Sequence, residues 1–394
     1  MSAKVTIWTR EFISMSLVNF LQYVSQYMLI TGLPIYIMTE LSGGEVEAGL
    51  VMTFFQIGTV VCRPLAGRFI DALDKRRVLY FAVGVFFILM ALFLLADRVE
   101  AIYAIRLVHG AQFALGTTVA ATLATLVLPS EKKGTGIGYF ALTTNLAMVV
   151  GPLVGLTLMQ SFGSQGFFCF LVGDGLLALI LAFLPKLTDD ICLPLKRKAP
   201  THAGRDMPKR GIVEMKAVPM ALLGGITFFA YGGMLVFIPL YAKALGMPEV
   251  VSVFFLVFAL VIVVTRPFIG SVFDRRGADY TIYPGFFFYL VGFLIFAHAA
   301  TYPWMIVAAA TIGLGFGAIS PALQTLAVRS VPPKRAGMAT ATYFWALDIS
   351  VGLAAAALGA VALHFGYEVL YGVVSPIAIV AALAFYTYLR RRTA

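Results

Sequence analysis

Four ionisable residues stand inside stretches of this sequence that are otherwise apolar, namely Asp174, Asp348, Arg106 and His109. Removal from water raises the pKa of a carboxyl group, so a buried carboxyl can load and release a proton near neutral pH. An arginine in hydrocarbon costs about 2.5–3.5 kcal/mol, so it normally faces a cavity and a partner. His109 follows Arg106 by one helical turn and would share its face. This combination predicts proton transfer, with Asp348 as the first candidate carrier and Asp174 as the second.

Structural roles stay open for three of these residues. Arg106 could reach an outer surface or pair with a neighbour, and His109 could pack among apolar side chains. Asp174 could cap a kink or pair locally.

The composition explains where such residues would sit. Of the 394 residues, 60% are hydrophobic and only 12% are charged, whereas about a quarter of a soluble domain is charged. The expected solvent is therefore a lipid bilayer. Cys62, Cys169 and Cys192 are far apart and show neither a metal-ligand spacing nor a disulfide framework. We expect no metal and no cofactor.

A membrane helix needs roughly 20 mostly apolar residues. Twelve stretches meet this requirement: 13–37, 48–70, 78–96, 101–128, 136–160, 166–185, 217–242, 250–273, 280–299, 303–328, 338–363 and 367–389. The first is too long for a signal peptide and no small-residue cleavage site follows it. We therefore predict an all-α membrane protein with twelve spans.

The basic residues fix the predicted orientation. They concentrate in the N-terminal tail, in the connections after every second span and at the C-terminal end, whereas the alternate connections hold only Arg98 and Lys243. The basic side stays cytoplasmic. We expect both termini inside the cell and a multi-pass protein of the plasma or inner membrane. The net charge of +10 is then an orientation signal and not a nucleic-acid footprint.

The chain repeats itself at an offset of 203 residues. RPLAGRFID at 63–71 returns as RPFIGSVFD at 266–274, and LPSEKKGTG at 128–136 returns as VPPKRAGMA at 331–339. Asn145 falls opposite Asp348 at the same offset. We predict two six-helix halves, residues 1–185 and 217–394. A basic cytoplasmic linker, 186–216, would join them and could hold a short surface helix.

This pattern resembles the major facilitator superfamily. The loop signature of that family, Gly-x-Leu-x-Asp-Arg-x-Gly-Arg-Lys/Arg, is matched by Gly67, Asp71, Lys75, Arg76 and Arg77, and departs at Ala72 and Asp74. The second copy supplies Gly270, Asp274, Arg275 and Gly277 but lacks the final basic pair. The resemblance implies two halves that rock around a central site.

The repeated motif predicts a gate. We expect Asp71 and Asp274 to latch the inner side in the outward-open state, either by pairing with arginine or by sitting at the positive N-terminus of a neighbouring helix. The remaining gating candidates are Arg63, Gly67, Arg76, Arg77, Arg266 and Gly270. The alternative is that these residues are ordinary caps and positive-inside anchors.

The resemblance extends to the fourth and fifth spans. Arg106 and Gly110 match a family motif associated with proton coupling. The antiporter signature of the fifth span is matched at Gly138, Gly151, Pro152 and Gly155, with Ala147 and Leu156 in place of two glycines. The small face would permit tight packing against the other half. This match favours export over import.

The family also implies a substrate cavity lined by the first, fourth, seventh and tenth spans. Asn19, Gln22 and Gln26 form one polar stripe on the first span, and we expect it to meet Arg106 and His109 across that cavity. A hydrogen-bonded seam between helices is the alternative. Asn145 and Tyr231 complete the candidate cavity residues, although packing could explain Tyr231.

We therefore expect a monomeric, proton-driven exporter of a small organic solute, resembling the drug:proton antiporter group. A symporter that imports a small carboxylate on Arg106 is the transport alternative, and a non-transporting sensor is a third. An enzyme is not expected, because GLGFG at 313–317 has no preceding strand and we find no nucleophile elbow.

Overall fold

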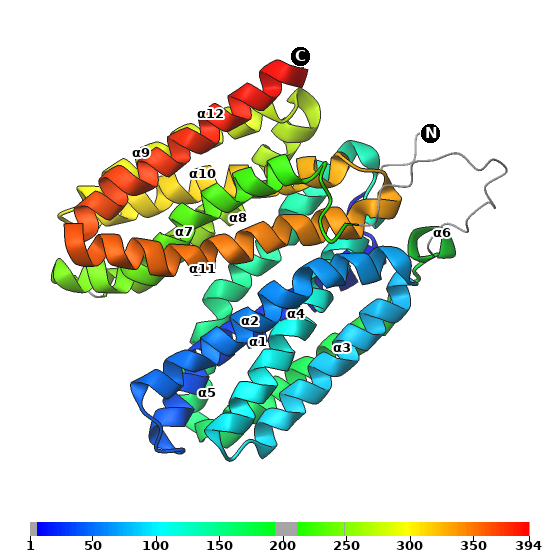
Figure 1. Cartoon of the computed structure of the whole chain (residues 1–394), viewed down its shortest axis with the longest axis vertical. Helices are drawn as coiled ribbons and strands as arrows, with labels where there is room; N and C mark the ends of the chain where they lie inside the picture. The colour runs from blue at the N-terminus through cyan, green and yellow to red at the C-terminus, as the bar shows by residue number, and fades with distance from the viewer. Residues whose placement is uncertain (1–5, 194–210, 248, 394) are drawn as a thin grey trace. The chain divides into compact units, whose positions relative to one another are not determined.

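The computed structural model describes residues 6–193, 211–247 and 249–393. All regular secondary structure in these ranges is helical (Figure 1), so the all-α prediction is confirmed. The middle of the predicted linker, 194–210, lies outside the described residues.

The helices coincide closely with the predicted apolar stretches. The first half of the chain contains α1 (Arg10–Thr39), α2 (Glu45–Ala72), α3 (Lys75–Leu92), η1 (Phe93–Leu95), α4 (Val99–Val127), η2 (Ser130–Lys132), α5 (Lys133–Phe183) and α6 (Asp189–Cys192). The second half contains α7 (Val218–Ala244), α8 (Val250–Arg276), α9 (Asp279–Ala297), α10 (Tyr302–Arg329), η3 (Pro333–Arg335), α11 (Ala336–Val369), η4 (Leu370–Val374) and α12 (Ser375–Thr393).

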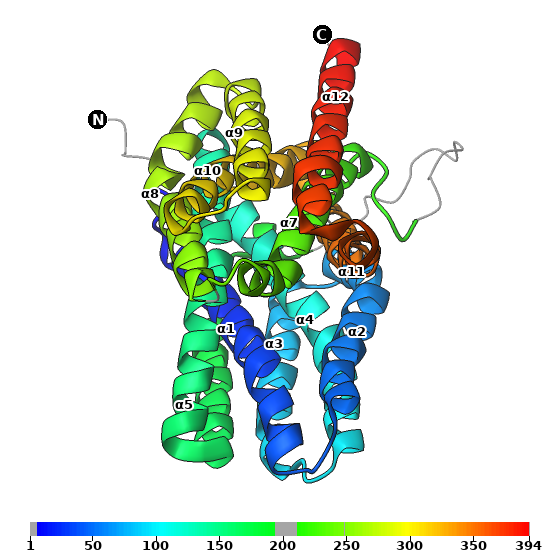
Figure 2. The same ribbon diagram turned by 90° about the vertical axis from the view of Figure 1, so that its left-hand side faces the viewer.

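Two of these helices each contain a sharp break. Gly163 in α5 has φ +67° and Gly366 in α11 has φ +83°. Glycine adopts this left-handed region without the steric penalty that a Cβ brings. The chain of α5 reverses at this point, and Figure 2 shows its two limbs. Each break falls between two predicted stretches, which the hydropathy pattern separates only weakly.

Nine helical segments within the described ranges are long and apolar enough to cross a bilayer. They lie in α2, α3, α4, α5, α7, α8, α9, α10 and the region from α11 into α12. The chain is thus a multi-pass membrane protein. The count of twelve spans and the inside position of both termini stay predictions.

The described chain forms two compact units. Unit 1 comprises Met1–Pro129, Leu146–Val218 and Val328–Phe344, and unit 2 comprises Ser130–Asn145, Pro219–Ala327 and Trp345–Ala394. The first turns of α5 therefore belong to unit 2, and those of α11 belong to unit 1. The predicted boundaries at 185 and 217 stay a prediction.

Close helix packing builds the interior of unit 1. A Cβ added at Gly58 of α2 would lie 2.1 Å from the carbonyl oxygen of Leu107 in α4. One added at Gly110 of α4 would lie 2.0 Å from the carbonyl oxygen of Phe55. Small residues at such contacts let helix backbones approach in membranes. The approach fixes α4, and with it the polar residues that α4 carries.

Candidate functional site: two aspartate caps and a buried polar cluster

The aspartate of the first motif caps the start of another helix. Asp71 lies in the last turn of α2, and its carboxylate accepts hydrogen bonds from the backbone of Gly337 (2.9 Å) and Met338 (2.8 Å). These amides belong to the first turn of α11, which begins at Ala336. The first amides of a helix have no partner within it and carry partial positive charge, so a carboxylate is stabilised there.

The aspartate of the second motif makes the reciprocal contact. Asp274, near the end of α8, accepts from the backbone of Gly134 (2.9 Å) and Thr135 (2.8 Å) at the start of α5. Asp71 and Asp274 are 203 residues apart, and so are Gly134 and Gly337. Each half of the sequence thus supplies one carboxylate and one helix start. We call these contacts the two aspartate caps.

Glycine is required where each cap forms. A Cβ at Gly337 would lie 2.7 Å from Oδ1 of Asp71, and a Cβ at Gly134 would lie 2.7 Å from Oδ1 of Asp274. Both distances are too short for a carbon atom beside a carboxylate oxygen. A side chain at either position would therefore displace the carboxylate.

The motif glycines bring the capped helices together. A Cβ at Gly67 would lie 2.6 Å from Cβ of Ala341 in α11, and one at Gly270 would lie 2.8 Å from Cα of Thr135 in α5. Both predicted gating glycines therefore lie directly beneath the caps.

The motif arginines lie deeper and hold neighbouring helices. Arg63 is buried, and its Nη1 donates to the hydroxyls of Thr117 (3.1 Å) and Thr118 (3.2 Å) in α4. Arg266 is equally buried, and its Nη1 donates to the carbonyl of Gly317 in α10 (2.9 Å). These bonds tie α2 to α4 and α8 to α10. Neither arginine is an aspartate-cap donor; the caps use backbone amides.

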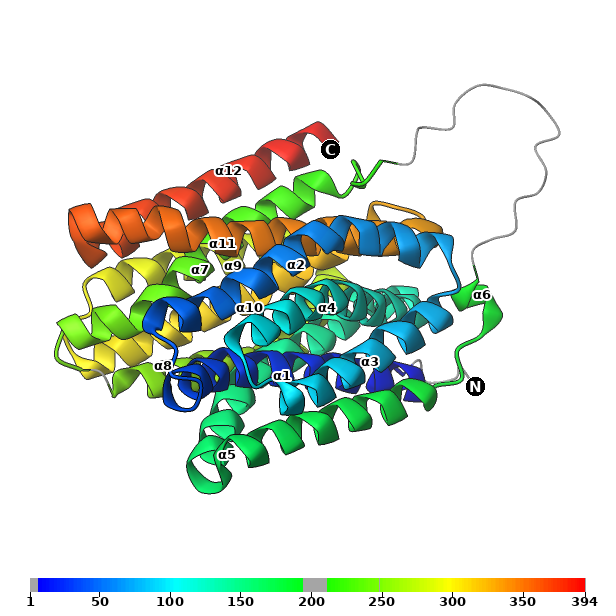
Figure 3. The same ribbon diagram turned by 60° about the horizontal axis from the view of Figure 1, so that its bottom comes forward.

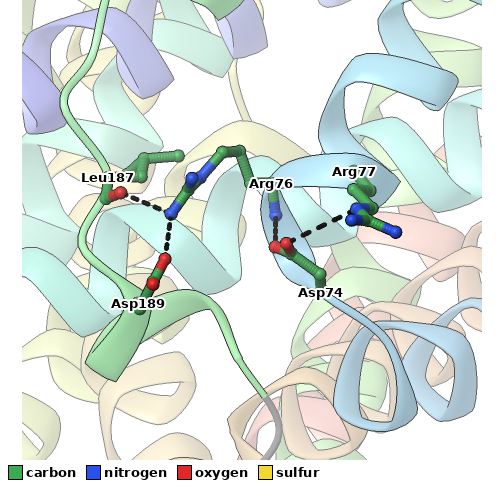
Figure 4. A network of polar contacts seen from close by, with 5 residues as sticks. All are labelled: Asp74, Arg76, Arg77, Leu187 and Asp189. Atoms are coloured by element: carbon green, nitrogen blue, oxygen red, sulfur yellow. Dashed lines mark hydrogen bonds and ion pairs between the residues drawn. The ribbon is translucent and has the colours of Figure 1, made fainter.

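Arg76 is directed toward the start of the linker (Figure 4). Its Nη2 donates to the carbonyl of Leu187 (2.7 Å) and pairs with Asp189 at 2.8 Å. Asp74 caps α3 through the backbone amide of Arg76 (2.9 Å), and the exposed Arg77 lies 3.8 Å from Asp74. Figure 3 shows α6, which follows α5, beside the start of α3. Arg76 and Arg77 therefore do not contact Asp71 through any of these bonds.

The far end of the linker docks on α11. Glu214 is buried, and its Oε2 pairs with Nε of Arg335 at 2.7 Å. Its backbone amide donates to the hydroxyl of Thr342 (2.9 Å). Sequence reasoning missed Glu214, because no local pattern links it to a residue more than a hundred positions away.

A separate polar cluster lies inside unit 1 between α1 and α4. Arg106 is fully buried, and its Nη1 contacts Oε1 of Gln26 and Nδ1 of His109, each at 3.0 Å. Its guanidinium lies 4.3 Å from the ring centre of Phe55, in cation–π geometry. No carboxylate of the described residues lies within ion-pair distance of Arg106. The charge is balanced there by neutral groups alone.

The rest of the polar stripe continues this cluster. Gln22 accepts from Nε2 of Gln112 (3.0 Å), and Gln112 also donates to the carbonyl of Ala82 in α3 (3.1 Å). Asn19 is buried on the same face of α1. The structure thus brings Gln22 and Gln26 to α4 as expected, in the contacts of a hydrogen-bonded seam. Their role in substrate binding stays a prediction. Gln112 was missed, although it follows His109 by three residues.

Asp174 lies on the second limb of α5 and faces α1. Its side chain is 6% exposed, and its Oδ2 accepts a hydrogen bond of 2.6 Å from the hydroxyl of Ser25. Of the roles left open by the sequence, local pairing is the one that the geometry contains. Ser25 itself was not among the predicted residues.

The remaining proton and cavity candidates belong to unit 2. Asp348 is half-buried on α11, and Asn145 is half-buried on α5. Tyr231 is buried on α7 and stacks on Phe316 with ring centres 4.5 Å apart.

The fifth-span signature faces two different elements. A Cβ at Gly151 would lie 2.6 Å from Cβ of Tyr27, and one at Gly155 would lie 3.2 Å from Cα of Met28, both on α1. A Cβ at Gly138 would instead lie 2.8 Å from Cδ of Arg266 on α8. Pro152 is inside the first limb of α5. Only Gly138 therefore packs against the other half of the sequence by these contacts.

Comparison with known proteins agrees with this architecture. The chain is 27% identical over 374 residues to an uncharacterized MFS-type transporter, YhhS, from Salmonella typhi, covering 91% of this chain and 87% of that protein. The crystal structure of the human organic anion transporter MFSD10 matches with a TM-score of 0.75 at 15% identity, covering 95% of this chain and 98% of that chain. A bacterial homologue of the iron transporter ferroportin, in an outward-facing state, matches with a TM-score of 0.73 at 15% identity, covering 96% and 99%.

At these identities the solved structures establish the fold alone. The sequence profile described as Major Facilitator Superfamily matches residues 15–355 and 300–394. Since these matches span well over half of the chain, the protein belongs to the Major Facilitator Superfamily and is a membrane transporter.

Proposed function

We propose that this transporter exports a small organic solute in exchange for protons, by alternating access. The observation that carries the proposal is the pair of reciprocal aspartate caps. Each cap joins the second span of one sequence half to the fifth span of the other through two backbone amides.

The strength of the caps suits a gate that must open. A carboxylate at a helix N-terminus contributes about 0.3–1 kcal/mol when exposed and up to ~2 kcal/mol when partly buried. Two such contacts favour one state by a few kcal/mol, which is enough to populate it and small enough to be reversed in each cycle. Asp71 and Asp274 would hold the inner gate shut and release it together.

The topology that goes with this gate has twelve spans and both termini in the cytoplasm. The caps, Arg76, Arg335 and the linker ends all belong to connections on the basic side of the sequence, which the positive-inside rule assigns to the cytoplasm. The transporter would work as a monomer in the cell membrane.

Protons would drive the exchange through carboxyl groups within the helices. Asp348 on α11 is the first candidate carrier, with Arg106 and His109 as a polar relay in the opposite half. The nearly complete antiporter signature at Gly138, Gly151, Pro152 and Gly155 supports export. The solute would leave as the proton enters.

A second candidate function is the symport of a small carboxylate with a proton. It is favoured by one observation: Arg106 has no carboxylate partner among the described residues. An anionic solute could supply that partner.

The test is proton movement in proteoliposomes that carry the wild type or Asp348→Asn. A pH gradient is imposed, and lipophilic cations, neutral drugs and small acids are added in turn. The exporter predicts proton movement against the flux of a compound, abolished in the variant. Movement of protons together with a small acid would establish the symporter. Absence of coupling with every compound would refute both.

A further inference from the structure

The carboxyl group of Asp174 is unusual among the charged groups of this protein. It is buried, and the hydroxyl of Ser25 is its hydrogen-bond partner. No cationic side chain of the described residues lies within ion-pair distance. On the side of α3, Phe87 and Met90 pack against the neighbouring Gly175.

A carboxylate in such surroundings is costly. Burying an ion without a counter-ion costs several kcal/mol, and proteins avoid the cost by binding a proton. Ionisable residues inside membrane segments are therefore functional by default. Asp174 has the surroundings of a group that holds a proton for part of a cycle.

The position of Ser25 connects this carboxyl to the polar cluster. Ser25 and Gln26 are adjacent on α1 but contact opposite neighbours. Ser25 donates to Asp174 on α5, whereas Gln26 accepts from Arg106 on α4. One turn earlier, Gln22 contacts Gln112 of α4. A single turn of α1 is thus held by polar contacts from both sides.

We propose that Asp174 is a proton-binding site and that its protonation state sets how firmly α5 holds α1. The proposal rests on the proposed proton-driven transport and adds to it a second carrier, in a different unit from Asp348. α1 carries the predicted cavity stripe, so the proton would act directly on a helix that lines the transport path.

The chemistry requires only proton transfer. Ionised, Asp174 accepts the hydroxyl hydrogen of Ser25 in a charge-assisted bond, which is roughly twice as strong as a neutral one. When a proton from water adds to one carboxyl oxygen, that charge assistance is lost. The Ser25 hydroxyl is then free to bond the carbonyl four residues earlier in α1, as serine does in helices. Release of the proton to water restores the first bond.

The chain offers a matched control at Ser14. Its hydroxyl also joins α1 to the second limb of α5, by donating to the carbonyl of Leu181. No titratable group takes part in this contact. Ser14→Ala and Ser25→Ala therefore remove similar bonds between the same two helices, and only the second touches the proposed site.

The experiment measures labelling of Asp174 by dicyclohexylcarbodiimide, which adds to protonated carboxyl groups in apolar surroundings, over a range of pH with mass-spectrometric detection. Wild type should label at acidic pH and lose labelling as the pH rises. Ser25→Ala should extend labelling to higher pH, with proton affinity raised roughly tenfold because a bond to the charged form is gone. Ser14→Ala should match wild type, and Ser25→Thr should restore it.

Two results would overturn the proposal: no labelling of Asp174 at any pH, or equal profiles for Ser25→Ala and Ser14→Ala. Asp174→Asn is then tested for proton-coupled transport and for solute counterflow without a gradient. The proposal predicts weakened coupling with retained counterflow. If the labelling behaves as predicted but wild type couples no solute to protons, the proposed function fails while the proton site stands.

Discussion

The two copies of the repeated motif agree in one contact and are reversed in another. Both aspartates cap a helix start with hydrogen bonds of 2.9 and 2.8 Å. Five residues after each aspartate, Arg76 and Asp279 also occupy equivalent positions, 203 residues apart. Arg76 pairs with Asp189 at 2.8 Å, whereas Asp279 pairs with Arg390 of α12 at 2.7 Å.

The difference separates what the fold needs from what the gate needs. An ion pair ties the start of the third helix of each half to the chain near the end of its sixth, and either polarity serves that purpose. The caps allow no such reversal, because helix starts attract only negative charge. The retained sign of Asp71 and Asp274 is thus the mark of a role beyond packing.

The largest expected effect comes from neutralising the caps. Asp71→Asn and Asp274→Asn should each weaken the capped state by about 1–2 kcal/mol, a factor of roughly 5–30. The readout is maleimide labelling of thiols introduced by Ala341→Cys, beneath the first cap, and Thr135→Cys, beneath the second, with the native cysteines replaced by serine.

A gate that rocks as one body predicts faster labelling at both thiols in either variant. Asp190→Asn, an exposed acid near the linker, is the control and should change neither rate. If each substitution exposes only its own thiol, the two caps act independently and the reciprocal gate is wrong.

A somewhat smaller effect is expected from filling the cap glycines. Gly337→Ala and Gly134→Ala place a methyl group 2.7 Å from a carboxylate oxygen, and overpacking of this kind typically costs about 1–3 kcal/mol, part of which side-chain shifts relieve. Thermal unfolding in detergent measures the loss. Gly352→Ala on α11 meets nothing within 4 Å and should be neutral or stabilising. Equal losses at 337 and 352 would show that helix propensity, not the cap, decides.

The reversed ion pairs give the next test. Arg76→Asp alone should lose the contact, while Arg76→Asp with Asp189→Arg adopts the polarity of the second copy and should recover it. The coupling should be only about 0.2–1 kcal/mol, because the side chain of Asp189 is 73% exposed. A double-mutant cycle by thermal unfolding at low and high salt measures it. Failure of the swapped pair to recover would mean that polarity matters here too.

The smallest effect is expected at Arg77. Its side chain is 88% exposed and 3.8 Å from Asp74, so Arg77→Ala should change the free energy of unfolding by less than about 0.5 kcal/mol. A larger loss would give the trailing basic residues of the first motif a structural role that the second motif lacks.

Much of this was readable from the sequence, for physical reasons. Apolar stretches long enough to cross a bilayer identify the helices, and the 203-residue repeat singled out Asp71 and Asp274. The segments that hold Gly134 and Gly337 were also recognised as a repeat. Their pairing with the aspartates was not, because contacts across 140 or 266 residues leave no local spacing.

Other elements were out of reach for a different reason. Ser25 is one small polar residue in an apolar helix and has no pattern of its own until Asp174 is placed beside it. The breaks at Gly163 and Gly366 resemble any glycine in a membrane helix. Division of α5 and α11 between two units depends on packing along the whole chain, which hydropathy does not encode.

The anchored ends of the linker have a practical consequence. Arg76 holds Leu187 and Asp189 at one end, and Arg335 and Thr342 hold Glu214 at the other, all within unit 1. Added residues between these anchors would only enlarge a loop, and each doubling of loop length costs about 0.6 kcal/mol. A reporter domain inserted between 194 and 210 should therefore leave transport intact, and the two halves expressed as separate chains should assemble through the same anchors.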